Sequence, residues 1–382
     1  MPDGVAIVGA AESDLGVTGQ TILGLQAQGV TRALADAGLT LADVDGLATT
    51  GVSRFSTAQV AEYLGIQPTW AEATMAGGAS FEIFLGHAAE AIRAGRCEVV
   101  VISYGSNQRS ARSRSLGGVS ETHLPDQQFE APYGPLYPIS LYAMAAQRYL
   151  HEYAATPEQL AEVAVAARAW ALLNPKAFRH DAGPLSVEDV LASPLVSSPL
   201  RVADCCLVTD GGGAIVVTSL ERARDLAQPT VVVRGWGECT TSSSMAQVPD
   251  LLVPGAAVSG RRALADAGLT VTDIDVLQVY DSFTINVLLS LEALGVCGPG
   301  EAARLVEDGR IAPGGSLALN TSGGGLSYCH PGMLGLLLII EAVAQLRGQA
   351  CARQVPGART ALVHATGGIL STHATVVLEA GR

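Results

Sequence analysis

At 382 residues the chain is longer than one hydrophobic core usually organises, so we expect two domains or two fused halves. Its 48% hydrophobic content and 43 glycines are typical of a compact, turn-rich α/β protein, not of a fibrous or disordered one. The net charge of −13, with Lys176 as the only lysine, argues against nucleic acid or an anionic membrane as partner, because both bind basic surfaces.

Short apolar runs alternate with amphipathic windows along the chain, a pattern typical of α/β layering with buried strands. Apolar runs predict strands at 5–11, 98–107, 212–219, 230–238 and 276–283, and a final hairpin at 361–369 and 374–380. Apolar residues at helical spacing predict helices at 21–37, 80–94, 139–152, 157–173, 258–267, 284–294 and 332–347.

The stretch from about 106 to 200 differs from its surroundings. It holds RSARSRSLGG, a Pro- and Tyr-rich piece (APYGPLYPIS) and two helical windows. We interpret it as a region inserted between strands, which is where substrate-contacting loops usually lie. Within it, 106–135 is the candidate for a loop that closes over a substrate.

The cysteines and the apolar segments bear on the cellular compartment. The seven cysteines contain no CxxC pair and no pattern typical of secreted proteins. The chain opens on MPDGVAIVGAAES without a charged leader, and its longest apolar stretch, near 333–344, is too short to span a bilayer and contains Glu341. We therefore expect a cytoplasmic protein with reduced thiols and no membrane span.

The nonapeptide RALADAGLT occurs twice, at 32–40 and at 262–270. Both copies continue into an Asp-x-Asp-x-Leu exit, as LADVDGL in the first and VTDIDVL in the second. A chance match between Ala- and Leu-rich helices would explain the helix but not the shared exit. We therefore predict an internal duplication, with an N-terminal half over 1–225, including the inserted region, and a C-terminal half over 226–382.

Each half also carries a glycine-bearing turn followed by an apolar helix. These are GGASFEIFLGHAAEAIRAG at 77–95 and CHPGMLGLLLIIEAVAQLRG at 329–348. Two such halves would face each other across a pseudo-twofold axis. Paired helix N-termini offer backbone N–H groups to a developing oxyanion, so the sequence predicts an active site between the halves, at these two turns.

Four segments carry a family resemblance: SPLRVADCCLVTDGGGAIVV at 198–217, VYDSFTINVLLSLEALGVCGPGEA at 279–302, LNTSGGGLSYCHPG at 319–332 and HATGG at 364–368. Together with the duplication, they resemble the thiolase superfamily and, within it, the sterol-carrier-protein-x and nonspecific lipid-transfer-protein subgroup. The resemblance spans nearly the whole chain. It implies a duplicated, five-layered αβαβα sandwich of the α/β class that is usually dimeric and acts on acyl-CoA thioesters.

The sequence departs from the thiolase pattern at the nucleophile. Thiolases carry a reactive cysteine where the first matched helix begins, but this chain reads ATMAGGASF there, so the position falls at Ala76 or Gly77. Neither residue can attack a thioester. We interpret Cys97, Cys205 and Cys206 as buried, inert residues and not as replacements.

Other family motifs are also altered. The subgroup's His-Asp-Cys-Phe motif is replaced by YDSF at 280–283, and the second thiolase cysteine, in a loop with two glycines, is represented by His364. One catalytic histidine of the family is retained as His330, although the preceding glycine is Cys329 here.

The surviving groups fit a lyase better than a thiolase. Claisen cleavage requires a covalent acyl-enzyme, because the acyl group must wait for free CoA. Stabilising a CoA-thioester enolate requires only preorganised donors and a base. We therefore predict retro-aldol cleavage of a 3-hydroxyacyl-CoA to a ketone or aldehyde and a shorter acyl-CoA. Coenzyme A would enter as the thioester substrate, with no covalently bound cofactor.

The candidate site contains two sets of residues. Tyr280 or Tyr328 would be the acid/base, tuned by burial near a cation because an unperturbed pKa of about 10 makes tyrosine a poor base. His330 would donate to the enolate and manage its proton. The full catalytic set is Tyr280, Tyr328, His330 and His364. The oxyanion and supporting set is Gly77, Gly78, Asn320, Asp281 and Cys329.

Two other aldolase mechanisms are disfavoured. A Schiff-base enzyme would depend on Lys176, which lies in NPKAF, far from any motif in the sequence. A metal-dependent enzyme needs clustered histidines and carboxylates, and the seven histidines are scattered without ligand spacing, so we predict no metal site.

The resemblance also implies partners. Members of the subgroup that lack the cysteine are often encoded beside a small protein with a zinc ribbon and an OB-fold, of the DUF35 type. Similar actinobacterial members act as aldolases in steroid side-chain degradation. The resemblance therefore implies a homodimer with a DUF35-type partner and a sterol-derived or otherwise bulky, branched acyl-CoA as substrate.

Two alternatives remain open. Cys329, next to His330 at the head of the second matched helix, could be a displaced nucleophile for acyl transfer, with the helix N-terminus lowering its pKa. Alternatively, the protein could bind acyl-CoA or lipid without catalysis, or scaffold a catalytic partner. Tyr280, His330 and His364 together in one pocket would favour an enzyme, whereas side chains that face apart would favour binding.

Overall fold

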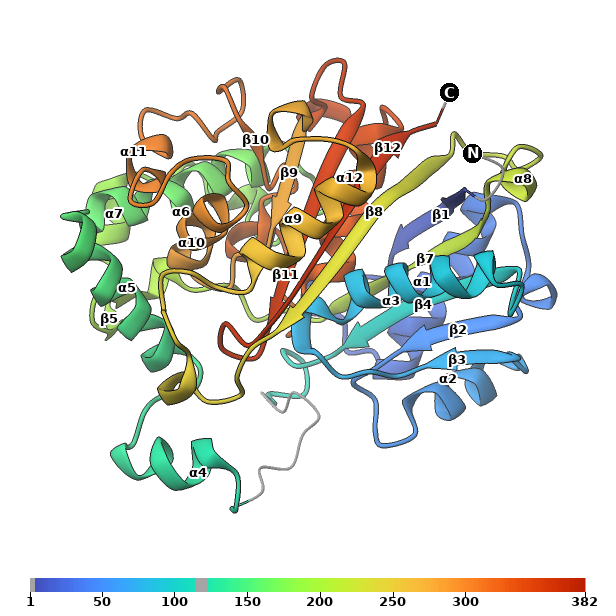
Figure 1. Ribbon diagram of the computed structural model, residues 1–382, viewed down its shortest axis with the longest axis horizontal. Coiled ribbons are helices and arrows are strands. Elements are labelled where there is room, and N and C mark those ends of the chain that lie inside the picture. The colour runs from blue at the N-terminus through green and yellow to red at the C-terminus, as the bar shows by residue number, and fades with distance from the viewer. Residues whose placement is uncertain (1–3, 114–121, 382) are drawn as a thin grey trace.

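The structure is a computed structural model that describes residues 4–113 and 122–381 (Figure 1). Its strands are β1 (Val5–Glu12), β2 (Gly46–Thr49), β3 (Trp70–Glu72), β4 (Val99–Ser106), β5 (Leu195–Ser197), β6 (Leu200–Arg201), β7 (Gly211–Ser219), β8 (Val231–Thr240), β9 (Val276–Val279), β10 (Ala318–Leu319), β11 (Thr360–Gly367) and β12 (Thr372–Ala380). Its α-helices are α1 (Ile22–Ala37), α2 (Ser56–Leu64), α3 (Ser80–Arg93), α4 (Pro125–Phe129), α5 (Ile139–Tyr153), α6 (Pro157–Leu172), α7 (Val187–Ala192), α8 (Leu220–Ala223), α9 (Ala256–Ala267), α10 (Thr284–Ala293), α11 (Ala302–Leu305) and α12 (Gly335–Leu346). Two short helical turns matter for the site, η2 (Gly77–Ala79) and η8 (Gly324–Tyr328).

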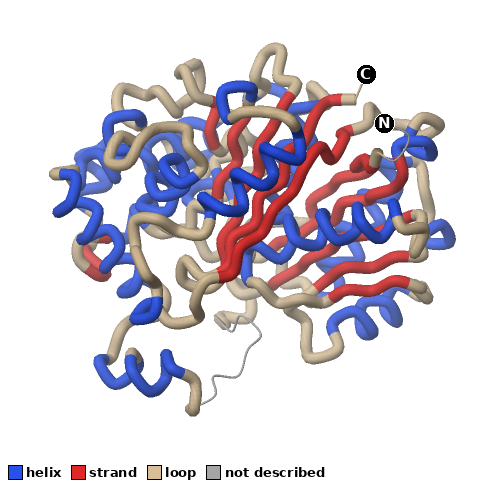
Figure 2. The backbone as a smooth tube through the Cα atoms, in the orientation of Figure 1, coloured by secondary structure: helices blue, strands red, loops and turns tan. Residues whose placement is uncertain are grey.

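The sheet repeats one topology twice. Its ten strands run β10-β9-β11-β12-β8-β1-β7-β4-β2-β3, so each half has the order 3-2-4-5-1 when its own five strands are numbered along the chain. In both halves the first three neighbours pair in parallel and the last two pairings are antiparallel. The halves join through an antiparallel contact of β1 with β8. Figure 2 shows the strands crossing the molecule, with helices on both faces.

The repeated nonapeptide has the same structural role in both halves. It forms the end of α1 and of α9, and the aspartates that follow it bond to backbone N–H groups. Asp45 accepts from Val99 N at 2.8 Å at the start of β4, and Asp275 accepts from Thr360 N at 3.0 Å at the start of β11. The second aspartate of the shared exit therefore ties the start of the second strand of each half to the start of the fourth.

The helices form the layers of a thiolase-like sandwich. Helix α1 packs on strands of the N-terminal half, and α9 packs on strands of the C-terminal half. Helices α3 and α12 pack against each other and against strands of both halves, so they form the middle layer. The buried apolar cluster around these two helices includes Tyr280, Tyr328 and Cys329, which places the candidate site in the centre of the molecule.

The apolar pattern predicted the long elements and missed the short ones. Strands β2, β3 and β10 have four residues or fewer and lack an apolar run, and α2 was also missed. The predicted strand 276–283 was too long. It ends at Val279, because Asn320 accepts from the Val279 N–H at 2.8 Å and donates to the Val279 carbonyl at 2.9 Å, which occupies the backbone groups that a longer ladder would use.

The region between β4 and β7 carries α4 to α7 as well as the short pair β5–β6. Helices α5 and α6 pack against α10 of the C-terminal half, and α4 projects from the body of the molecule (Figure 1). Residues 114–121 of the predicted substrate-closing loop at 106–135 lie outside the described residues. Within the described part of the chain, every helix is too short or too polar to cross a membrane.

Candidate active site

The starts of the two central helices meet at a pair of glycines. A Cβ atom at Gly78 would lie 2.1 Å from Cε2 of Tyr280, and a Cβ atom at Gly335 would lie 2.2 Å from the Gly78 carbonyl oxygen. Only glycine permits such approaches. The turn before α3, the start of α12 and the ring of Tyr280 therefore converge, as the pseudo-symmetry predicted.

Tyr280 and His330 form the centre of this convergence. The Tyr280 hydroxyl lies 3.0 Å from Nε2 of His330, with the rings nearly perpendicular at 87°. Burial raises the pKa of Tyr280 well above its ordinary value of 10 and lowers the pKa of His330 to about 4. Both side chains are therefore neutral near pH 7, and the pair can donate hydrogen bonds and exchange protons.

Thr209 fixes the position of His330. Its hydroxyl accepts from the His330 N–H at 3.0 Å, and its own N–H donates to the His330 carbonyl at 3.2 Å. Sequence reasoning missed Thr209, because a threonine before an aspartate carries no motif by itself.

Asp281 and Asn320 hold the backbone on either side of the tyrosine. Asp281 accepts from Gly325 N at 2.6 Å and from Leu326 N at 3.2 Å, which ties the end of β9 to η8. Burial raises the pKa of Asp281 to about 7, against these hydrogen bonds, which lower it. With the Asn320 clamp on Val279, both predicted supporting residues position the segment that carries Tyr280.

Tyr328 points to a different partner. Its hydroxyl donates to Oε1 of Glu12 at 3.0 Å, and Nζ of Lys176 donates to Oε2 of the same carboxylate at 2.6 Å. Lys176 was predicted to lie far from any motif. It does so in the sequence, but in the structure Glu12 connects it to Tyr328 of a family motif. Glu12 was missed because it sits at the end of a strand with no recognisable motif.

Cys329 does not have the surroundings of a nucleophile. Its thiol lies 3.1 Å from the Thr209 hydroxyl, and burial raises its pKa to about 12. The predicted activation by a helix N-terminus was wrong, because α12 begins at Gly335, six residues further on. At neutral pH this sulfur is a protonated thiol.

His364 does not join the tyrosine and histidine pair. Its Nδ1 lies 2.9 Å from the Thr375 hydroxyl, and its ring stacks on His373 with 5.6 Å between centroids. Thr375 in turn contacts Ser259 on α9, so this ring faces the outer helix layer. The structure thus brings together Tyr280 and His330, but only the backbone carbonyl of His364 reaches Tyr280, at 3.0 Å from its N–H.

The other cysteines are placed as follows. Cys97 is buried, with its pKa raised to about 11, chiefly by burial. Cys205 and Cys206 were predicted to be buried, but they are half-buried and line a cavity. At the predicted nucleophile position, Ala76 lies just before η2 and Gly77 begins it, and neither has a side chain that could attack a thioester.

That cavity has a volume of about 500 Å³ and is rimmed by three arginines. The guanidinium groups of Arg109 and Arg179 lie 5.2 and 5.8 Å from the ring centre of Phe178, and Arg168 donates to the Gly183 carbonyl at 3.2 Å. Among the described lining residues there is no carboxylate. In a chain of net charge −13, this is a local concentration of positive charge.

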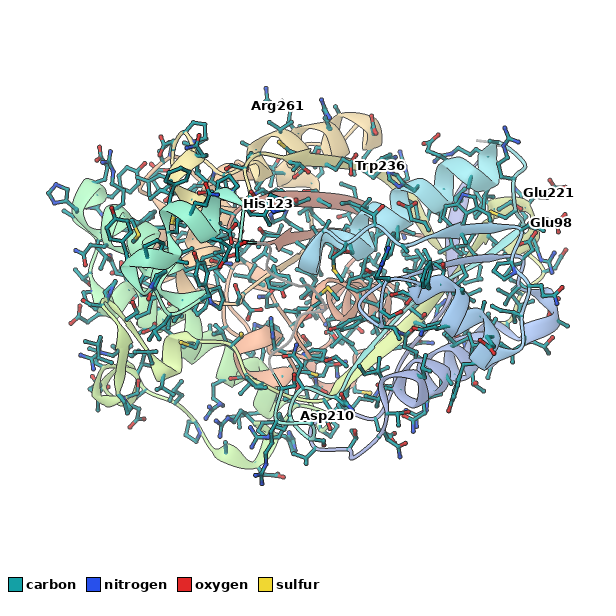
Figure 3. The ribbon with its side chains drawn as sticks, turned by 90° about the horizontal axis from the view of Figure 1, so that it is seen from below. Glu98, His123, Asp210, Glu221, Trp236 and Arg261 are labelled. Carbon is teal, nitrogen blue, oxygen red and sulfur yellow. The ribbon has the colours of Figure 1, made fainter. Side chains whose placement is uncertain are left out.

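The cavity borders the reaction centre. Its inner wall includes Leu326, whose N–H donates to Asp281, and Cys206. On its other side, Asp210 anchors the loop that carries Arg109, because its carboxylate accepts from Ser110 N and Thr18 N, each at 2.8 Å. Asp210 is buried in the lower part of the molecule as drawn in Figure 3. Arg168 and Arg179 had no sequence signal, since Arg168 is an isolated residue in α6 and Arg179 an isolated residue in the loop that follows it.

Comparison with known proteins agrees with this architecture. Residues 237–380 match the family described as Thiolase C-terminal domain-like. A 17-hydroxy-3-oxo-4-pregnene-20-carboxyl-CoA lyase of Mycobacterium tuberculosis is 38% identical over 95% of this chain and 96% of its own. A steroid side-chain-cleaving aldolase of Thermomonospora curvata is 37% identical over 91% of each chain.

A solved structure extends the agreement to the whole fold. An Ltp2-ChsH2(DUF35) aldolase has a TM-score of 0.90 at 34% identity, over 100% of this chain and 99% of that chain. The chain therefore belongs to the thiolase superfamily, in the group that includes the steroid side-chain-cleaving aldolases.

Proposed function

We propose that this protein is an acyl-CoA carbon–carbon lyase that cleaves a bulky or branched 3-hydroxyacyl-CoA by a retro-aldol reaction. The products are a ketone or aldehyde and a shorter acyl-CoA. The observation that carries the proposal is the Tyr280–His330 pair, 3.0 Å apart, beside the turn that holds Ala76 and Gly77, one of which takes the place of the thiolase nucleophile by the resemblance. Such a centre can move protons and hold an enolate, but it cannot form an acyl-enzyme at that position.

The reaction needs a base for the 3-hydroxyl and donors that hold the enolate oxygen. Tyr280 or Tyr328 takes the proton of the 3-hydroxyl as the Cα–Cβ bond breaks and the carbonyl forms, and it passes its own phenolic proton on, Tyr280 to His330 or Tyr328 to Glu12. The bonding electrons pass to the thioester enolate, whose oxygen is held by the neutral pair of Tyr280 and His330. The N–H groups of the Gly77–Gly78 turn lie in the first turn leading into α3, where backbone donors lack helical partners. Protonation of the enolate at Cα then gives the shorter acyl-CoA.

The arginine-rimmed cavity supports a coenzyme A thioester as substrate. Arginine matches phosphate oxygens with a planar set of donors, and CoA carries three phosphate groups. Arg109, Arg168 and Arg179 surround the cavity, and its inner wall adjoins η8 next to Asp281. A CoA headgroup held there would direct the pantetheine arm toward the reaction centre.

The relatives support the nature of the acyl chain and of the partner. One is named for a pregnene carboxyl-CoA and another for steroid side chains, so we extend a steroid-derived acyl chain to this protein. The solved relative is named as an assembly with a DUF35 protein. We propose that this chain, too, works with a DUF35-type partner containing a zinc ribbon and an OB-fold, and that it forms a homodimer.

The two alternatives have less support. Acyl transfer through Cys329 would require a thiolate, and the pKa of that thiol is raised to about 12. A non-catalytic binding role would leave the buried Tyr280–His330 pair without a purpose. The turning away of His364 removes one of the three polar side chains that we expected in the pocket, but it leaves this pair intact.

Product analysis tests the proposal. The purified protein, alone and with a DUF35-type partner, is given either a branched 3-hydroxyacyl-CoA or the matching 3-ketoacyl-CoA with free CoA. We expect a carbonyl compound and a shorter acyl-CoA from the first substrate, without added CoA. Turnover of the 3-ketoacyl substrate alone, dependent on CoA, would favour acyl transfer. Saturable binding of both thioesters without turnover would favour a binding subunit.

A further inference from the structure

Three side chains in contact, Lys176, Glu12 and Tyr328, run from the surface into the central apolar cluster that also contains Tyr280. Lys176, whose side chain is 60% exposed, lies 2.6 Å from Oε2 of Glu12, whose side chain is 13% exposed. The other oxygen of Glu12 accepts from the hydroxyl of Tyr328, which is 2% exposed, at 3.0 Å. Tyr328 precedes His330 by two residues and is buried in the same apolar cluster as Tyr280.

Glu12, Tyr328 and Lys176 come from three separate segments, and backbone hydrogen bonds between two of these segments hold the side chains in place. Glu12 is the last residue of β1, Tyr328 ends η8, and Lys176 lies in the loop after α6. That loop runs alongside η8, because Phe178 N donates to the Tyr328 carbonyl at 2.9 Å and Arg179 N donates to the Ser327 carbonyl at 3.1 Å. The same loop supplies two residues of the arginine-rimmed cavity.

The charges of Lys176 and Glu12 determine the direction in which the Tyr328 hydroxyl donates its proton. Burial alone would raise the pKa of Glu12, but the charge of Lys176 and the hydrogen bonds from Lys176 and Tyr328 bring it below its ordinary value. An ionised carboxylate only accepts hydrogen bonds, so the Tyr328 hydroxyl must donate to it. The lone pairs of the Tyr328 oxygen are then left to accept from another group.

We propose that Glu12 is a positioning residue of the reaction centre: paired with Lys176, it holds the Tyr328 proton and leaves the Tyr328 oxygen as the acceptor for the substrate hydroxyl. This inference rests on the proposed lyase function and chooses between the two candidate tyrosines for the base. Tyr280, paired with His330, keeps the role of holding and protonating the enolate.

The arrangement removes the need for a free phenolate. As the substrate hydroxyl gives its proton to the Tyr328 oxygen, the Tyr328 proton passes to Glu12. The O–H electron pair forms the new carbonyl, and the Cα–Cβ pair passes to the thioester enolate. Tyr280 and His330 supply a proton to Cα. Glu12 then releases its proton to solvent on the Lys176 side, and the Tyr280–His330 pair regains one, so no net proton is consumed.

The test compares the wild type with E12Q, K176M and K176R, using turnover of a branched 3-hydroxyacyl-CoA between about pH 5 and 9. An amide cannot take up the proton, so E12Q should lose about 10²-fold in kcat with little change in KM. K176M removes the charge that keeps Glu12 ionised, so the acidic limb of its kcat profile should move to higher pH. K176R keeps the charge and should retain the wild-type profile.

Each result separates this inference from the lyase proposal. A wild type that does not cleave the hydroxyacyl substrate contradicts the lyase function itself. An active wild type with unchanged kcat and pH profiles in E12Q and K176M overturns the role of Glu12 alone. A change in KM without a change in kcat also overturns it, because Glu12 would then only hold the cavity loop. K176M alters an exposed side chain, so it decides the matter even where E12Q fails to fold.

Discussion

The hydroxyl of Tyr280 lies 3.0 Å from Nε2 of His330, and both rings are almost fully removed from solvent. The pair connects two sequence motifs: Tyr280 lies in the motif that follows β9, and His330 lies in the motif that leads into α12. Burial keeps both groups neutral, which suits the holding of an enolate better than the activation of a thiol.

Removal of the Tyr280 hydroxyl should reduce catalysis without unfolding the protein. Y280F keeps the ring against Gly78 but cannot exchange a proton with His330, so we expect kcat to fall by about 10²-fold or more with little change in KM. Steady-state kinetics on a 3-hydroxyacyl-CoA measure this. Because the pKa of His330 is about 4, the wild-type kcat profile should show no limb near pH 6.5 from this histidine. An unchanged kcat in Y280F would remove this residue from the mechanism.

Loss of a cavity arginine should weaken substrate binding. R168A removes one of the charges around the cavity, and we expect KM for the CoA thioester to rise roughly tenfold with kcat nearly unchanged. R261A is a matched control, because Arg261 is exposed on α9, at the top of the molecule in Figure 3, whereas Asp210 lies in its lower part. Equal KM values for R168A and R261A would place the CoA headgroup elsewhere.

Glu82 should make the protein less stable as pH rises. Burial raises its pKa from 4.5 to about 8, and neither carboxylate oxygen has a hydrogen-bond partner among the described residues. Between these pH values the folded state binds more protons than the unfolded state, so the free energy of unfolding falls with rising pH. E82Q removes this dependence, so we expect its stability relative to wild type to improve by on the order of 1–3 kcal/mol from pH 5 to pH 8.

Urea unfolding at the two pH values measures that difference. E90Q provides the control, since Glu90 is an exposed carboxylate on the same helix. The same change in E90Q, or none in E82Q, would contradict the assignment of the pH dependence to Glu82.

His373 should make the protein less stable in acid. It is buried and stacked on His364, and its pKa is lowered to about 4, chiefly by burial. Between pH 6.5 and 4 the unfolded state binds the extra proton, so the free energy of unfolding falls as pH falls. H373F keeps a stacked ring without the titration and should flatten that slope, whereas H151Q, at an exposed histidine, should not. Chemical denaturation across this range distinguishes the two.

Most of the fold could be predicted from the sequence, because the repeated segment is visible in it. RALADAGLT and its aspartate exit repeat a structural unit, and the apolar runs that follow mark the long strands of both halves. Strand β10, with two residues, and β3, with three, are set by neighbouring strands and not by their own composition. Local patterns therefore could not reveal them.

The candidate site could be predicted only as far as its motifs reach. Tyr280 and His330 lie in motif positions, and the structure brings them together. His364 is also in a motif, but the alternation of side chains along β11 turns its ring outward, which the motif does not specify. Glu12, Lys176 and Thr209 became visible only when chain segments far apart in sequence were placed side by side.

We infer that carbon–carbon cleavage proceeds here without a covalent acyl-enzyme. The most direct test is a rapid quench of the protein with a 3-hydroxyacyl-CoA and no free CoA, followed by intact-protein and product mass spectrometry. We predict equal amounts of carbonyl compound and shorter acyl-CoA, with the protein mass unchanged throughout. A protein adduct of the mass of the acyl group, mapped to Cys329 or to any other residue, would contradict cleavage without an acyl-enzyme.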